Sequence, residues 1–137
     1  MKQIARISLL AILLLCPFFA AAQDDGYDVF VPIAKYIRQG DAVKLSAWFA
    51  DNLEVSILSS TNNASRNQAR QIVKAFFDNN TPRSFAISHK ASRGNTKYAL
   101  GTLNAGGEVY LVTIFVSYTT DAYQIQLLKI ERQSVFY

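Results

Sequence analysis

The sequence predicts an α+β domain in which three N-terminal helices pack on a curved, mostly antiparallel sheet of four to six strands. Two patterns lead to this prediction. Apolar residues recur at helical spacing in three segments of the first half of the chain, and they alternate as in strands over most of the second half. Short polar turns separate the later segments, so we expect antiparallel neighbours with the helices gathered on one face. A strongly bent sheet that is closed by helices on one side would form a cone with a cavity.

The first 22 residues have the layout of a secretory signal peptide. Lys2 and Arg6 precede an almost unbroken apolar run over residues 7–19, and three small alanines follow, ending at Ala22. The run is shorter than the ~20 residues that a membrane span needs. We therefore expect cleavage after Ala22, export to the periplasm or the medium, and no stable membrane insertion.

Cleavage would shorten the chain from 137 residues by 22, to 115, which is the length of one domain. We expect a flexible lead-in over residues 23–28, a single α+β cone domain over residues 29–133 and a tail over residues 134–137. Cleavage would also remove Cys16, the only cysteine, and with it any disulfide or thiolate metal ligand. Loss of the two basic residues near the N-terminus lowers the basic count from 14 to 12 against 10 acidic residues. The basic residues are scattered, which argues against a nucleic-acid partner.

The first two helices are predicted between residues 29 and 52. Apolar residues at helical spacing indicate the first helix, over residues 29–39, and Gly40 is well placed to end it. Asp41 can cap a second helix over residues 42–52 with its side-chain oxygen. The apolar face of this second helix would be formed by Ala42, Leu45, Trp48 and Phe49.

The third predicted helix has the clearest local signal of the chain. Ser65 and Gln68 form a capping box at its start, and two asparagines and a proline within residues 79–82 mark its end. Before this helix, residues 53–60 alternate as a half-buried strand does, and residues 61–64 are interpreted as a loop.

Four strands are predicted in the second half of the chain, over residues 84–92, 96–105, 108–120 and 122–133. The third of these strands is apolar on both faces, so we expect a central strand that is covered on both sides. The adjacent Leu127 and Leu128 break the alternation of the last strand, which indicates a β-bulge.

Four stretches of the chain resemble a known family: VFVPIAKYIRQGDAVKLSAWFADNLEVSI, SRNQARQIVKAFFDNNTPRSFAISHKAS, KYALGTL and YQIQLLKIE. They resemble the nuclear transport factor 2-like superfamily, also described as cystatin-like or ketosteroid-isomerase-like. Within it, the chain is similar to a bacterial family of small exported proteins, domain of unknown function 4783. The resemblance implies a fold and an exported location, and that family offers no assigned catalytic residues. The superfamily includes both enzymes and binding proteins, so the fold alone does not decide the function.

His89 is the only histidine of the chain and the one side chain suited to acid–base work near neutral pH. Alternation along its strand places it on one face with Phe85 and Ile87, toward the helices. An acid or base there would need a partner. Tyr98 and Tyr118 lie on nearby strands, but no Asp or Glu lies inside an apolar strand pattern. His89 is therefore a weak catalytic candidate, and a hydrogen-bonded structural role is favoured.

Aromatic side chains could instead line a ligand pocket. Trp48, Tyr98 and Tyr118, together with His89, would suit a flat apolar molecule. The alternative is that these aromatic side chains fill the cone as ordinary core, which small α+β domains need for packing. One histidine and no remaining cysteine make a zinc site unexpected, and no calcium loop or nucleotide-binding motif occurs. No metal or cofactor is therefore expected.

Three functions follow as hypotheses. The first is an exported, non-enzymatic domain that binds a small apolar ligand or a protein partner through the cone or a sheet face. The second is a lyase or isomerase in which His89 acts with a tyrosine. The third is a dimeric structural module that pairs through an exposed sheet face. The residues expected on that face are Tyr110, Val112, Ile114, Val116 and Tyr118.

Overall fold

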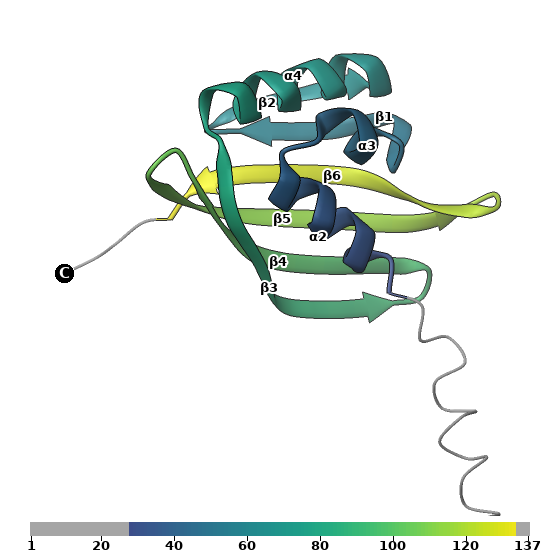
Figure 1. Ribbon diagram of the computed structural model, residues 1–137. Coiled ribbons are helices and arrows are strands. Elements are labelled where there is room, and N and C mark those ends of the chain that lie inside the picture. Colours follow the sequence, from purple (N-terminus) through teal and green to yellow (C-terminus); the bar gives the residue numbers. More distant parts are fainter. Residues whose placement is uncertain (1–27, 134–137) are drawn as a thin grey trace, which may run out of the picture.

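The computed structural model describes residues 28–133 (Figure 1). Its elements in chain order are α2 (Phe30–Gln39), α3 (Ala42–Ser46), β1 (Phe49–Ile57), β2 (Ser60–Ser65), α4 (Arg66–Asn79), β3 (Pro82–Arg93), β4 (Thr96–Ala105), β5 (Glu108–Thr119) and β6 (Ala122–Arg132). The predicted signal peptide, the lead-in before Asp28 and the tail over residues 134–137 lie outside the described residues. In the described part of the chain, no helix combines the length and the hydropathy that crossing a membrane requires.

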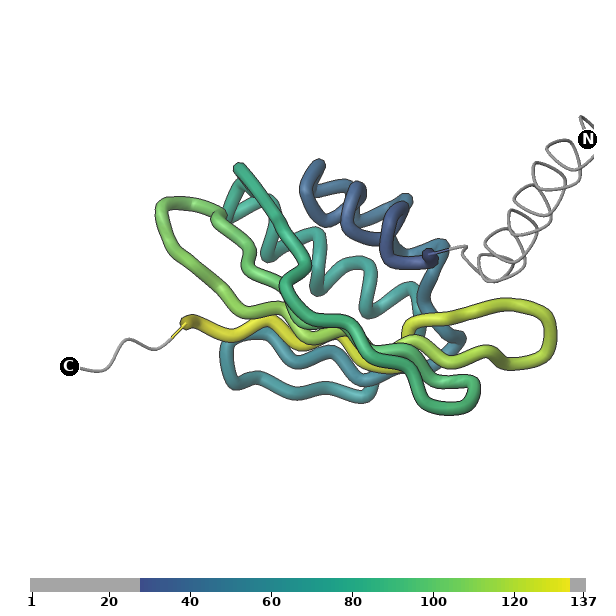
Figure 2. Tube along the Cα trace, turned by 90° about the horizontal axis from the view of Figure 1, so that it is seen from below, coloured from purple at the N-terminus to yellow at the C-terminus, as the bar shows by residue number. Residues whose placement is uncertain are grey.

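The six strands form one sheet in the order β2-β1-β6-β5-β4-β3. β1 runs parallel to β6, and the other neighbouring pairs are antiparallel. The three described helices lie on the same face of the sheet (Figures 1 and 2), which we call the inner face, and the opposite face is the outer face. The predicted α+β class is confirmed. The prediction of three helices is confirmed only in part, because α2 and α4 are substantial helices whereas α3 has only five residues.

Helix ends were predicted correctly where the signal is local. Gly40 follows α2 with φ +68°, and the next amide, that of Asp41, donates back into the last turn of the helix over 2.9 Å. The Asp41 carboxylate accepts a hydrogen bond from an amide of α3 over 3.0 Å. Ser65 and Gln68 form both hydrogen bonds of the capping box that begins α4.

The predicted extent of the second helix and the loop over residues 61–64 are wrong. α3 ends at Ser46, whose hydroxyl donates to the carbonyl of Val43 over 2.6 Å, and β1 begins at Phe49. Phe49 pairs with Ile125 of β6, so its buried side chain enters the core from a strand. Residues 61–64 belong to β2, which pairs with β1 in spite of its polar composition. Strand pairing over long sequence distances overrides the local pattern in both places.

The predicted bulge in β6 is confirmed. Phe115 of β5 pairs with Leu127, whereas the next residue of β5 pairs with Ile125, so Gln126 is an extra residue. The extra residue shifts the alternation by one position. As a result, Ile125 and Leu128 are both buried although they are three positions apart.

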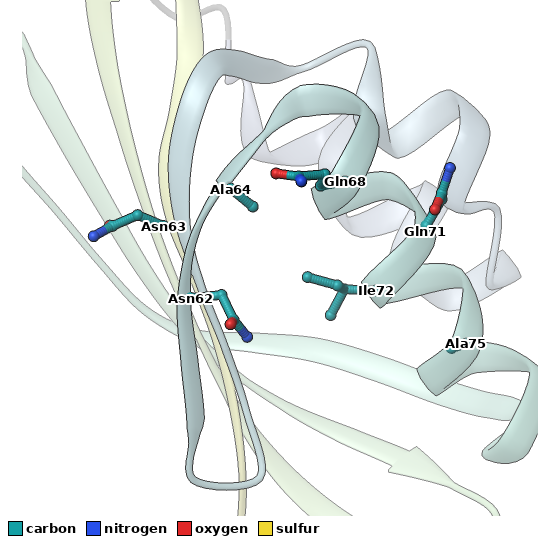
Figure 3. Close-up of a pocket in the computed structure, with 7 residues that line it drawn as sticks. All are labelled: Asn62, Asn63, Ala64, Gln68, Gln71, Ile72 and Ala75. Atoms are coloured by element: carbon teal, nitrogen blue, oxygen red, sulfur yellow. The ribbon is translucent and has the colours of Figure 1, made fainter.

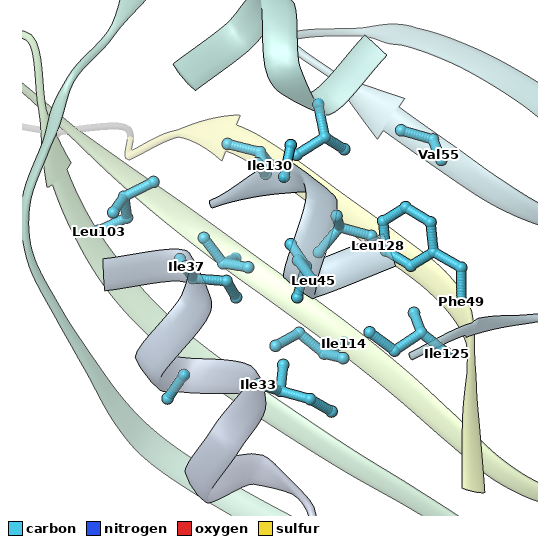
Figure 4. Close-up of a cluster of buried hydrophobic side chains, with 14 of the residues drawn as sticks. Ile33, Ile37, Leu45, Phe49, Val55, Leu103, Ile114, Ile125, Leu128 and Ile130 are labelled. Atoms are coloured by element: carbon cyan, nitrogen blue, oxygen red, sulfur yellow. The ribbon is translucent and has the colours of Figure 1, made fainter. Parts of the chain in front are cut away.

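The hydrophobic core lies between the inner face and the helices (Figure 4). Ile33 and Ile37 of α2 and Leu45 of α3 have almost no exposed surface. They pack over a set of equally buried strand residues that includes Phe49, Val55, Leu103, Ile114, Ile125, Leu128 and Ile130. Core side chains therefore occupy the space that an open cone would offer to a ligand.

The central strand β5 is buried on its inner side only. The buried, inward-facing residues are Tyr110, Val112, Ile114 and Val116. On the outer row, Val109 and Phe115 are each 38% exposed. The prediction of cover on both sides is therefore wrong within residues 28–133. Four of the five residues expected on an exposed pairing face belong instead to the core.

Candidate functional site

A second bulge, in β3, decides where His89 lies. Ile87 pairs with Gly101 of β4, whereas His89 pairs with Leu100, so Ser88 is an extra residue. Residues opposite each other in antiparallel strands point to the same face. Gly101 in turn pairs with Val112 of β5, which is buried on the inner face, so Ile87 also lies on the inner face. Leu100 is the neighbour of Gly101 in β4 and points to the opposite face, so its partner His89 lies on the outer face. The expectation that His89 points toward the helices is therefore wrong, because one extra residue inverts the alternation that follows it.

The surroundings of His89 are those of an open sheet surface. The exposed ring has its Nδ1 atom 3.2 Å from the carbonyl oxygen of Ser88. The Ser88 hydroxyl donates to the carbonyl of Leu100 over 3.2 Å, which adds a hydrogen bond where the bulge interrupts the ladder. A general base acts on a substrate that is held beside it. His89 is absent from the lining of four depressions formed by residues 28–133. Within the same residues, no group of three His, Cys, Asp or Glu side chains could hold a metal ion.

Tyr98 belongs to an apolar strip on the outer face. Its ring meets that of Phe115 edge-on, with centroids 5.3 Å apart and planes at 84°. Phe115 pairs in turn with Leu127 of β6. The register of the strands places Leu100 of β4 and Leu111 of β5 on the same face. We call this set the outer strip; it consists of Tyr98, Leu100, Leu111, Phe115 and Leu127.

Trp48 and Tyr118 lie apart from these two residues. Trp48 is in the turn between α3 and β1 and is half-buried against the core. Tyr118, near the end of β5, is 43% exposed, and its ring meets that of Tyr123 edge-on at 4.9 Å. The four residues expected to line one pocket are therefore divided. His89 and Tyr98 are diagonal neighbours on the outer face, and the other two occupy separate positions.

A depression of about 510 Å³ lies between β2 and α4 (Figure 3). Its lining combines side-chain amides with small apolar groups: Asn62, Asn63, Ala64, Gln68, Gln71, Ile72 and Ala75. The Gln68 side chain is already used in the capping box. Figure 3 shows Asn63 pointing to the other side of its strand. Few of these polar side chains point together into the depression, where they could bind one molecule. We therefore assign no ligand to it.

Another depression, of about 370 Å³, lies between α2 and β3, and we call it the α2–β3 groove. Its lining includes Val31, Lys35 and Arg38 from α2 and Ile87 and Lys90 from β3, with Asp28 beside them. Sequence alternation could not reveal this groove, because the bulge at Ser88 turns Lys90 to the inner face, where it pairs with the buried Ala99.

An ion pair lies within this groove. The Lys90 ammonium is 2.5 Å from the Asp28 carboxylate. Partial burial raises the pKa of the Asp28 carboxyl, but hydrogen bonds from Lys90 and from the amide of Phe30 outweigh that effect. The pKa of Asp28 is therefore held below its ordinary value, with further help from the charges of Lys90 and Lys97.

Many solved structures share the fold of this chain, and three of them illustrate the range. A DUF4783 family protein from Bacteroides uniformis is 20% identical, and the match covers 79% of this chain and 100% of that one with a TM-score of 0.75. An NTF2-like protein of unknown function from Cytophaga hutchinsonii is 8% identical over 77% of this chain and 88% of its own, with a TM-score of 0.58. A Thiobacillus denitrificans protein assigned as a calcium/calmodulin-dependent protein kinase type II association domain is 10% identical over 75% and 90%, with a TM-score of 0.60.

The family follows from the sequence match. No curated protein matches the chain. The sequence model of the domain of unknown function DUF4783 matches residues 30–131, which is most of the chain. The resemblance seen in the sequence is thereby confirmed at both levels, superfamily fold and family. The protein belongs to the DUF4783 family and has an NTF2-like fold.

Proposed function

We propose that this protein is an exported, non-enzymatic interaction domain that pairs with a second copy of itself through the outer face of its sheet. The observation that supports this best is the outer strip, a row of apolar side chains across three strands on the face that the described helices leave uncovered. Uncovered apolar patches mark contact surfaces. A small apolar ligand under the helices is less well supported, because core side chains occupy that space.

The size of the outer face suits a dimer. Strands lie about 4.8 Å apart and rise about 3.3 Å per residue, so four strands of about ten residues offer on the order of 600 Å² of flat area. Side chains roughen this surface and enlarge it. A standard interface takes about 800 Å² from each partner. The outer face is therefore large enough to supply one side of a stable dimer.

The charges beside the outer strip suit pairing of like with like. Lys129 and Glu131 follow Leu127 on β6, with their charged groups 3.8 Å apart, and Glu54 of β1 lies opposite Leu127. A twofold axis brings the same set of residues from both copies together. A face with both signs of charge can therefore complement its own copy, whereas a face with one sign would repel it.

One comparison concerns association as a use of this fold. The Thiobacillus denitrificans protein that shares the fold is assigned as an association domain. At 10% identity that likeness extends to the fold alone. The proposal for this chain therefore depends on its own outer strip.

Light scattering on two variants tests the pairing. Phe115→Glu places a charge within the outer strip, and we expect it to reduce the wild-type dimer to a monomer. Val43→Glu is the matched control, because Val43 is 60% exposed on α3, on the inner side of the sheet, and this variant should stay dimeric. Circular dichroism checks that both variants fold. A monomeric wild type, or a folded Phe115→Glu variant that remains a dimer, contradicts the proposal.

Export is the second part of the proposal, and it depends on the sequence of the first 22 residues. Expression of the full chain in a Gram-negative host, followed by mass spectrometry of the periplasmic fraction, tests it. We expect a processed chain that begins at Gln23. Full-length protein that stays in the cytoplasm contradicts export and leaves the pairing proposal to its own test.

A further inference from the structure

β3 is the last strand of the sheet and pairs with β4 alone among the described strands. It is 12 residues long, whereas β2 at the opposite edge has six. An edge strand presents unpaired backbone N–H and C=O groups to any extended chain that reaches it. The α2–β3 groove brings side chains of α2 beside this edge. Main-chain pairing and side-chain contacts are thus available at one place.

The groove combines an excess of positive charge with an apolar wall. Lys35 and Arg38 come from α2, and neither forms an ion pair within residues 28–133. Lys90 adds a third cation from β3, and its charge is shared with the single carboxylate of the groove, that of Asp28. Val31 lies one turn before Lys35 on the same side of α2 and is 65% exposed. Among the large hydrophobic side chains of the described chain, it is the most exposed.

We infer that the α2–β3 groove binds an acidic peptide in extended conformation, added as a strand along β3. Recognition by strand addition takes its affinity from main-chain hydrogen bonds and its specificity from alternate side chains of the peptide. Acidic side chains of the peptide face Lys35 and Arg38, and apolar ones contact Val31 and Ile87. The groove lies apart from the outer strip, so this binding does not depend on self-association.

A labelled peptide that repeats Glu-Thr-Val-Thr places its Glu and Val side chains on the same face of an added strand, and its binding to the purified protein is measured by fluorescence anisotropy at low salt. The matched control is a peptide that repeats Lys-Thr-Val-Thr. We expect the acidic peptide to bind, the basic peptide to fail, and added salt to weaken the acidic complex. Amide chemical shifts should change along β3. Equal binding of both peptides, no binding of either, or shifts confined to β2 or the outer strip overturns the inference.

Substitution of Val31 tests the groove, and the same substitution of Val43 is the matched control. Val31→Asp adds a negative charge to the groove and should weaken the acidic peptide by about tenfold or more, as should the double variant Lys35→Glu, Arg38→Glu. Val43→Asp changes a valine of similar exposure outside the groove and should leave the affinity unchanged. Equal weakening by both valine variants overturns the inference. A wild-type dimer that Val31→Asp dissociates would assign the groove to a second copy and overturn it as well.

Discussion

Gly101 provides a sharp test of the packing between β3 and β4. A Cβ atom at Gly101 would lie 2.7 Å from two ring atoms of Phe85 and 2.8 Å from the carbonyl oxygen of Ala86. Gly101→Ala must therefore displace a buried ring or the backbone of β3. Overpacking of this kind costs about 1–3 kcal/mol, and the stiffer unfolded chain offsets roughly 0.4–1 kcal/mol of it. The midpoints of these two ranges predict that the free energy of unfolding falls by about 1.3 kcal/mol.

Urea unfolding followed by the fluorescence of Trp48 measures this loss. The midpoint should fall while the dependence on urea concentration stays the same. Phe85→Leu removes the ring atoms that the new methyl group meets, so Gly101→Ala should cost less in that background. Unchanged stability in Gly101→Ala, or the same cost in both backgrounds, would refute the packing of the Phe85 ring over Gly101.

Two further predictions concern polar contacts. Tyr110→Phe removes the buried hydroxyl that donates to Asn80 Oδ1 over 3.2 Å, and urea unfolding should show a loss of about 1 kcal/mol; an unchanged midpoint would contradict a stabilising bond. The pKa of Asp28 is lowered by folding, so its charge stabilises the protein above the ordinary pKa of 3.8, and this stabilisation is lost as the pH falls through the folded-state pKa. Thermal unfolding should therefore show wild type more stable than Asp28→Asn at neutral pH, with the gap narrowing in acid, and a gap that does not change with pH would contradict this reasoning.

Short-range interactions explain what the sequence could predict. The cap at Gly40 and the capping box of Ser65 and Gln68 each involve groups a few residues apart, so their residue types alone indicated them. The bulge beside Leu127 showed in the sequence because two adjacent leucines cannot both follow a strand alternation. The order of most elements followed from these signals.

Long-range pairing explains what the sequence could not predict. β2 is polar, and only its pairing with β1 makes it a strand. Ser88 fits equally well as an ordinary outward-facing residue and as the extra residue of a bulge. If Ser88 were an ordinary strand residue, His89 would lie on the inner face and Lys90 on the outer face. Because Ser88 is the extra residue of a bulge, the two side chains lie on the opposite faces. The bulge therefore places Lys90 and not His89 on the inner face, where Lys90 lines the α2–β3 groove.

The central claim is that the outer strip pairs two copies of this chain. Sedimentation equilibrium on the wild-type protein, from low to high micromolar concentration, tests it most directly. We predict that the average mass rises with concentration to twice that of one chain. A mass that stays at that of one chain over the whole range would contradict the claim.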